Sequence, residues 1–98
     1  MIYHIITKER WAEFEYKAAY TSDTLTAEGF IHCSRKEQIA GVLTRFYAEI
    51  ENLLLMEIDE SKLTSPLLYE PATDVVDTFP HIYGPINCGA IVSVVVIQ

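Results

Sequence analysis

The chain has 98 residues, half of them hydrophobic, and a formal net charge of −7. This length fits one small domain over residues 1–98 with a core of its own. The acidic excess argues against non-specific nucleic-acid binding, and no apolar run reaches the roughly 20 residues of a membrane span. With no signal-peptide pattern and only two cysteines, we expect a cytoplasmic protein with reduced thiols.

The first third of the chain is predicted to run strand, helix and loop. Residues 2–6 form a short, mostly apolar run, which is typical of a short buried strand. Thr7 is placed to cap a helix over residues 8–16, because its hydroxyl can accept a bond from a backbone N–H. Residues 20–29 favour a loop with one helical turn, which Gly29 ends because glycine tolerates a positive φ.

The middle of the chain carries the strongest helix signal. A second short strand is predicted over residues 30–33. Ser34 and Glu37 then fit a capping box, a hydroxyl with a carboxylate three residues later. Apolar residues follow at intervals of three and four, which places them on one face of a helix: Ile39, Val42, Leu43, Phe46 and Ile50.

The second half of the chain is predicted to be mostly extended. Residues 53–58 alternate as a strand, and residues 91–97 are so apolar that we expect a central strand. Between them we expect a helical turn near 59–62, short extended pieces at 67–70 and 82, and a turn at 87–89. Early helices and late strands indicate an α+β domain with two or three helices and a curved, mostly antiparallel sheet.

Three histidines are the first candidates for chemistry. His4, His32 and His81 lie in strand-like, aromatic surroundings, and an imidazole titrates near neutral pH and can both donate and accept a hydrogen bond. The alternative for each is a half-buried histidine bonded to the backbone. Cys33 is a weaker candidate for a nucleophile, because neighbours on a strand face opposite sides and His32 cannot easily serve it.

Residues near His32 and His81 are suited to holding a ligand. Ser34 and Arg35 precede the predicted helix, whose first N–H groups and dipole attract an anion such as phosphate. Phe30, Phe79 and Tyr83 are candidates for stacking on a planar ligand. The alternatives are a simple cap at Ser34, a solvated charge at Arg35 and core packing for the three rings.

No metal is expected. The nearest set of possible ligands consists of His32, Cys33, His81 and Cys88, whose spacing matches no compact Cys/His module. A zinc ion held by these four residues is the open alternative. The chain also lacks the phosphate-binding glycine loops and the nucleophile elbow that would announce a common enzyme class.

Short runs spread over nearly the whole chain give a more specific indication. They are Tyr3-His4-Ile5, Trp11, Glu28-Gly29-Phe30-Ile31-His32-Cys33-Ser34, Gln38 and Phe79-Pro80-His81-Ile82-Tyr83-Gly84. Together they resemble domain of unknown function family 952, an uncharacterised bacterial and plant family. The resemblance implies a fold similar to that of ADP-ribosyltransferases, in which a split, strongly curved antiparallel sheet clasps NAD.

The more distant comparison covers fewer positions. Tyr3-His4 resembles the start of the Tyr-His-Gly-Thr segment of ADP-ribosyltransferase-like proteins, whereas Ile5-Ile6 departs from it. The run from Ile31 to Ser34 resembles the strand before a helix in RNA 2′-phosphotransferases. Such enzymes often complete the site with a late glutamate, a position for which Glu70 and His81 are the candidates here.

Residues and resemblance together predict a cleft that binds a small phosphate-containing ligand, with NAD as one candidate substrate. The residues predicted to act on the ligand are His4, His32 and His81. Those predicted to bind it are Phe30, Ser34, Arg35, Gln38, Glu70, Phe79 and Tyr83. The alternative is a non-catalytic domain that binds a protein or a peptide, and whether the chain is an enzyme stays open.

Overall fold

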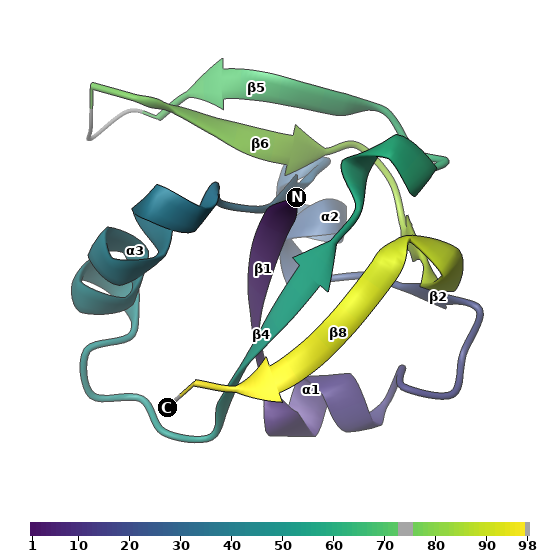
Figure 1. Cartoon of the computed structure of the whole chain (residues 1–98), viewed down its shortest axis with the longest axis horizontal. Helices are drawn as coiled ribbons and strands as arrows, with labels where there is room; N and C mark the ends of the chain where they lie inside the picture. The colour runs from purple at the N-terminus through teal and green to yellow at the C-terminus, as the bar shows by residue number, and fades with distance from the viewer. Residues whose placement is uncertain (73–75, 98) are drawn as a thin grey trace.

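The computed structural model describes residues 1–72 and 76–97 (Figure 1). Its strands form two three-stranded sheets and one two-stranded sheet, and every pairing in these ranges is antiparallel. In sheet order the first comprises β1 (Ile2–Thr7), β4 (Leu53–Ile58) and β8 (Ile91–Val96). The second comprises β3 (Ile31–His32), β6 (Thr78–Ile82) and β5 (Leu67–Pro71), and the third pairs β2 (Ala19–Tyr20) with β7 (Ile86–Asn87).

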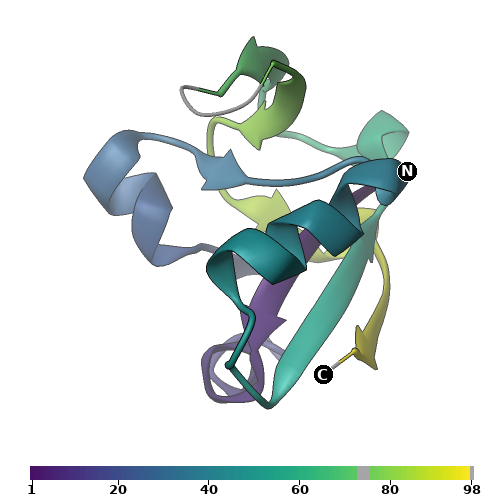
Figure 2. The same ribbon diagram turned by 90° about the vertical axis from the view of Figure 1, so that its left-hand side faces the viewer.

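Helices concentrate in the first half of the chain, as the sequence predicts. They are α1 (Lys8–Ala12), α2 (Asp23–Glu28) and α3 (Ile39–Phe46), with 3-10 turns η1 (Lys36–Gln38), η2 (Glu60–Lys62) and η3 (Cys88–Ala90). Figures 1 and 2 show α3 outside β1, at the open edge of the first sheet. Among the described residues, no helix is long and apolar enough to cross a membrane. The domain is therefore small and α+β, with mostly antiparallel sheets.

The core lies on one face of the first sheet. The register pairs Ile2 with Ile58 and Ile6 with Leu54, so their side chains, two or four residues apart on each strand, share a face. These four residues are buried together with Met56, which is wholly inaccessible. Burial of this apolar face stabilises the fold, and it confirms both strands that the sequence predicts here.

Within residues 1–72 and 76–97, one isolated bridge joins the two three-stranded sheets. The Tyr3 N–H donates to the Ser34 carbonyl oxygen at 2.8 Å, and the Ser34 N–H donates to the Tyr3 carbonyl oxygen at 2.7 Å. This contact brings β3 beside β1. His4 directly follows Tyr3, and His32 lies two residues before Ser34, so the bridge brings the two histidines close together.

The same bridge corrects the predicted capping box. Ser34 is buried and pairs with β1, so it does not cap the helix with Glu37. The cap lies one residue later, where the Arg35 N–H donates to Gln38 Oε1 at 2.8 Å. The helix also stops at Phe46, short of Ile50, because Tyr47 leaves the helical region at φ −132°.

Two further predictions about the elements were wrong in extent or place. The first helix keeps its Thr7 cap, where Arg10 N–H donates to Oγ1 at 3.2 Å, but it ends at Ala12 in tighter turns such as Phe14 N–H to the Trp11 carbonyl. Strand β8 lies at the edge of its sheet and β4 is central. Apolar composition alone does not distinguish an edge strand from a central strand.

Candidate functional site

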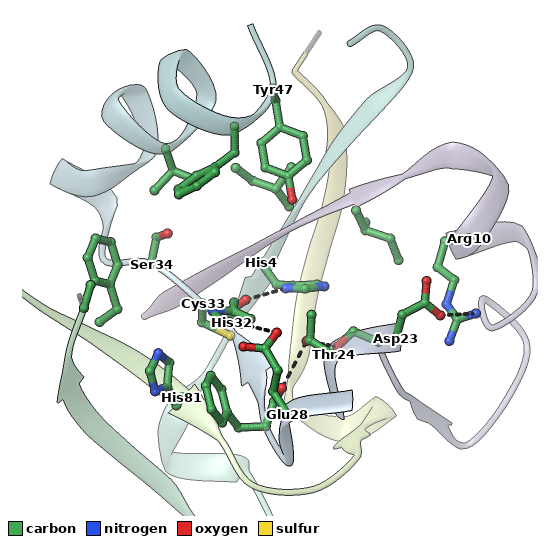
Figure 3. Close-up of a pocket in the computed structure, with 18 of the residues that line it drawn as sticks. His4, Arg10, Asp23, Thr24, Glu28, His32, Cys33, Ser34, Tyr47 and His81 are labelled. Atoms are coloured by element: carbon green, nitrogen blue, oxygen red, sulfur yellow. Dashed lines mark hydrogen bonds and ion pairs between the residues drawn. The ribbon is translucent and has the colours of Figure 1, made fainter. Parts of the chain in front are cut away.

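A cavity of about 680 Å³ opens between α3, β1, β3 and β6 (Figure 3). This volume is typical of small-molecule sites. Because β1 is an edge strand, the cavity reaches both of its faces, with His4 on one and Ile5 on the other. The predicted site residues that line it are His4, Phe30, His32, Ser34, Phe79 and His81.

His4 is held at both ring nitrogens. Nδ1 lies 2.7 Å from the His32 carbonyl oxygen and therefore donates, which leaves Nε2 to accept from the Tyr20 hydroxyl at 2.9 Å. Burial lowers the pKa of His4 to about 4, although the bond to His32 opposes this. His4 is thus neutral near pH 7, and neither nitrogen is available to a ligand while these bonds hold.

His32 occupies the rim of the cavity. Its side chain is 50% exposed, and Nε2 lies 3.2 Å from Glu28 Oε2, four residues earlier on α2. The β3–β6 register places His32 opposite His81, and the two rings meet edge to face with their centroids 5.4 Å apart. Figure 3 shows His4, His32 and His81 in a row along one wall of the cavity.

His81 is buried beneath this rim and bonded to a carboxylate. Its Nδ1 lies 2.8 Å from Oε1 of Glu70, which also accepts a hydrogen bond from the Tyr83 hydroxyl. The bonds from Tyr83 and His81 lower the pKa of Glu70, and the first of them raises the pKa of Tyr83. Phe30 stacks on the His81 ring with centroids 4.0 Å apart. Glu70 and Tyr83 thus lie behind His81, outside the cavity lining.

Arg35 and Gln38 lie away from the main cavity and bind the start of β6. The Arg35 guanidinium contacts Asp77 Oδ1 and the Thr78 carbonyl oxygen, each at 2.8 Å. Gln38 Nε2 donates to Asp77 Oδ2 and to the same carbonyl, also at 2.8 Å. The bonds from Gln38 and Arg35 lower the pKa of Asp77 to about 2. Gln38 also borders a smaller hollow of about 160 Å³ together with Phe79.

Two arginines that sequence reasoning missed also line the cavity. Arg10 contacts Asp23 at 3.2 Å and the Thr21 carbonyl oxygen at 3.0 Å. Arg45, on the last turn of α3, forms no ion pair with any described residue, and its guanidinium lies 5.6 Å from the centre of the Phe46 ring. Arg45 lies three residues after Val42, which belongs to the apolar face of the helix. This spacing is the sequence signal that could have identified Arg45 as a neighbour of that face.

The described ranges hold no group of three His, Cys, Asp or Glu side chains placed to bind a metal ion. Both cysteines are free, Cys33 buried and Cys88 exposed. Burial raises the pKa of the Cys33 thiol, so the reactive thiolate is disfavoured.

Comparisons with known proteins identify relatives of the fold. A family model described as "Protein of unknown function (DUF952)" matches residues 5–94. The crystal structure of protein CC0527 from Caulobacter crescentus has a TM-score of 0.87 at 24% identity, over 99% of this chain and 85% of that one. Its solution NMR structure has a TM-score of 0.83 at 24% identity, over 99% and 84%. No curated protein matches. These likenesses show the fold, and neither description names an ADP-ribosyltransferase.

Proposed function

The chain belongs to the DUF952 family, whose description gives no function, and from its cavity we propose that it binds a small phosphate-bearing ligand. One observation carries this proposal. His32, His81 and Arg45 come from three separate elements and line the same cavity of about 680 Å³. Small-molecule sites combine a concave, mostly apolar wall with a few convergent polar groups of this kind.

The charges of the lining favour an anionic group near Arg45. Asp23 is paired with Arg10 at 3.2 Å, and Glu28 lies 3.2 Å from the ring of His32. Arg45 has no such counter-ion within the described part of the chain, so its guanidinium has its hydrogen-bond donors available. Guanidinium groups bind phosphate through paired hydrogen bonds.

Aromatic rings in the same lining favour a planar group on the ligand. Phe30 and Phe79 both line it, and Phe30 already stacks on His81. A nucleoside base or a nicotinamide ring can stack on such a surface. NAD and ADP-ribose combine a planar ring with phosphates, so the resemblance to ADP-ribosyltransferases makes ADP-ribosyl transfer the candidate reaction.

The test is a titration followed by amide NMR, with inorganic phosphate, AMP, ADP-ribose and NAD as probes. We expect shifts at the cavity residues, and about tenfold weaker binding for Arg45→Ala, because a charge-assisted hydrogen bond is lost. Lys36→Ala is the matched control, since Lys36 is exposed on η1 and outside the cavity. Equal weakening by both substitutions, or no shift with any probe, would contradict the proposal.

A protein-interaction domain is the second candidate, favoured by the exposed edge of β8. Val92, Val95 and Val96 are apolar and half or more exposed there, and an edge strand can pair with a strand of another molecule. A second copy of the chain is the partner to test first. A dimer in sedimentation equilibrium that Val95→Lys dissociates would support this function, whereas a monomer at every concentration would count against it.

A further inference from the structure

We infer that His81 is the proton-accepting residue of the cavity, oriented by Glu70 so that its Nε2 faces the ligand. This inference rests on the proposed function for the presence of a ligand. It adds a division of roles among the three histidines, with Glu70 and Tyr83 as positioning residues.

The bond to Glu70 fixes which nitrogen of His81 carries the proton. A carboxylate accepts hydrogen bonds and cannot donate one, and the lowered pKa of Glu70 keeps it ionised near neutral pH. At 2.8 Å from Glu70 Oε1, Nδ1 must therefore donate. The neutral ring then has its lone pair at Nε2, the form that a proton acceptor needs. Tyr83 bonds the same carboxylate oxygen and holds it in place.

The free nitrogen of His81 is accessible from the cavity. The side chain is 10% exposed and lines the cavity wall. Nε2 of His81 has no hydrogen-bond partner among the described residues. Among those residues, Nε of Arg10 is the only side-chain polar atom that is both fully buried and without a partner, so Nε2 of His81 is not fully buried. Nε2 is therefore open to solvent or to a ligand. Phe30, stacked on the ring face, limits how far the imidazole can turn.

The other two histidines are less suited to this role. His4 has a hydrogen bond at each nitrogen and a pKa lowered to about 4 by burial. His32 is 50% exposed, and its contact with Glu28 is 3.2 Å long at the surface. His81 alone combines a buried ring, a short bond to a carboxylate and an open nitrogen.

Nε2 of His81 takes a proton from a hydroxyl group of the ligand or from a bound water, and the electron pair of the broken O–H bond stays on the oxygen. The ring becomes an imidazolium whose charge the Glu70 carboxylate stabilises. In the reverse step the imidazolium returns this proton to the oxygen or to a water molecule.

The inference is tested first on the free protein by two measurements. Long-range ¹H–¹⁵N NMR of the imidazoles reports the tautomer, and we expect His81 to carry its proton at Nδ1. Carbethoxylation with diethyl pyrocarbonate, located by mass spectrometry, reports access, and we expect label on His81 and His32 while His4 is protected. A proton at Nε2 of His81, or an unlabelled His81 in the folded protein, would overturn the inference.

A pair of variants separates positioning from simple packing. Glu70→Ala is expected to release the His81 tautomer towards the Nε2-protonated form of a free imidazole. Glu28→Ala removes the corresponding carboxylate from His32 and is expected to leave the His81 tautomer unchanged. If both variants move it, or neither does, Glu70 is not the positioning residue. Failure of nucleotide binding would overturn the proposed function without altering either readout, so the two failures are distinguishable.

Discussion

At the scale of single residues, the three histidines differ in what their ring nitrogens contact. His4 donates to a backbone carbonyl and accepts from Tyr20. His32 contacts a surface carboxylate, and His81 contacts a carboxylate that a tyrosine also binds. The residue type is the same, but burial and hydrogen-bond partners differ: His4 and His81 both carry their proton at Nδ1, and only His81 leaves Nε2 open. These differences are why we infer that His81, with His32 beside it, is the proton acceptor of the cavity.

The lowered pKa of His4 predicts that acid destabilises the fold. Its ordinary pKa of 6.5 falls to about 4 in the folded chain because burial disfavours the charged ring. Between these values the unfolded chain takes up a proton that the folded chain does not. The contribution to the free energy of unfolding is thus complete above pH 6.5, and about 3 kcal/mol of it is lost by pH 4.

Urea unfolding of the wild type and His4→Gln between pH 4 and pH 7.5 measures this effect. The variant is expected to be less stable at pH 7.5, because buried hydrogen bonds are disturbed, yet to lose less stability on acidification. His32→Gln is the matched control, because it removes an exposed histidine and leaves both hydrogen bonds of His4 in place. Parallel profiles for the wild type and His4→Gln would contradict the prediction.

The binding partner of Arg35 and Gln38 could not be predicted from the local sequence. The position of Arg35 before a helix predicts an anion site, Gln38 is also predicted to bind the ligand, and an anion does bind both. It is the Asp77 carboxylate, 42 residues after Arg35 along the chain. The local pattern identified the chemistry of the two side chains, but nothing in it reveals a partner supplied by the fold. Arg45 is a different case, because its helical spacing from Val42 was a local signal that it lies beside the apolar face.

At the scale of elements, periodicity predicted most strands, but neighbours decided their ends and places. The strands at 2–6 and 53–58 and the turn that Gly29 ends at φ 90° are as predicted. Ser34 has both the residue type and the position of a cap, yet its backbone pairs with Tyr3 instead. Strand β8 is apolar enough for a central place, but the sheet order depends on long-range pairing that composition does not encode.

Gly84, two residues after the end of β6, is predicted to be intolerant of a side chain. It has a φ of +155°, and an added Cβ would lie 2.5 Å from Ser65 Oγ, which donates to the Pro85 carbonyl oxygen. Gly84→Ala is therefore expected to cost about 1–3 kcal/mol of unfolding free energy. Gly41→Ala is the matched control, because Gly41 lies in α3 with nothing within 4 Å of an added Cβ.

The control substitution is expected to change the free energy of unfolding in the opposite direction. Alanine in a helix loses less conformational entropy on folding than glycine does, so Gly41→Ala is expected to stabilise by about 0.5–1 kcal/mol. Thermal unfolding of both variants beside the wild type measures the two changes. A Gly84→Ala protein as stable as the wild type would show that Ser65 moves aside at no cost.

At the scale of the whole molecule, the cavity exists because two sheets meet at one bridge. Histidines at positions 4, 32 and 81 are far apart in sequence, and the Tyr3–Ser34 bridge together with the His32–His81 register brings them together. The sequence could predict that these residues were candidates. Their convergence depends on pairings between distant segments, which only the folded chain reveals.

The net charge of the whole chain predicts how salt changes its thermal stability. Seven uncompensated negative charges lie in a molecule with a radius of gyration of 12.6 Å, close to the screening length of about 10 Å at 0.1 M salt. Repulsion among them destabilises the compact state at low salt. Raising NaCl from about 10 mM to about 500 mM at pH 7 is therefore expected to raise the melting temperature by a few degrees.

Salt also weakens ion pairs, so the sign of the change shows which effect is larger. Pairs such as Arg35–Asp77 and Arg10–Asp23 are partly exposed, and exposed pairs contribute little to stability. Repulsion is thus expected to be the larger effect at pH 7. Near the isoelectric point of about 4.7 the excess charge is gone, so the same salt series is expected to leave the melting temperature unchanged or slightly lower. A melting temperature that falls with salt at pH 7 would mean that the specific pairs outweigh the net charge.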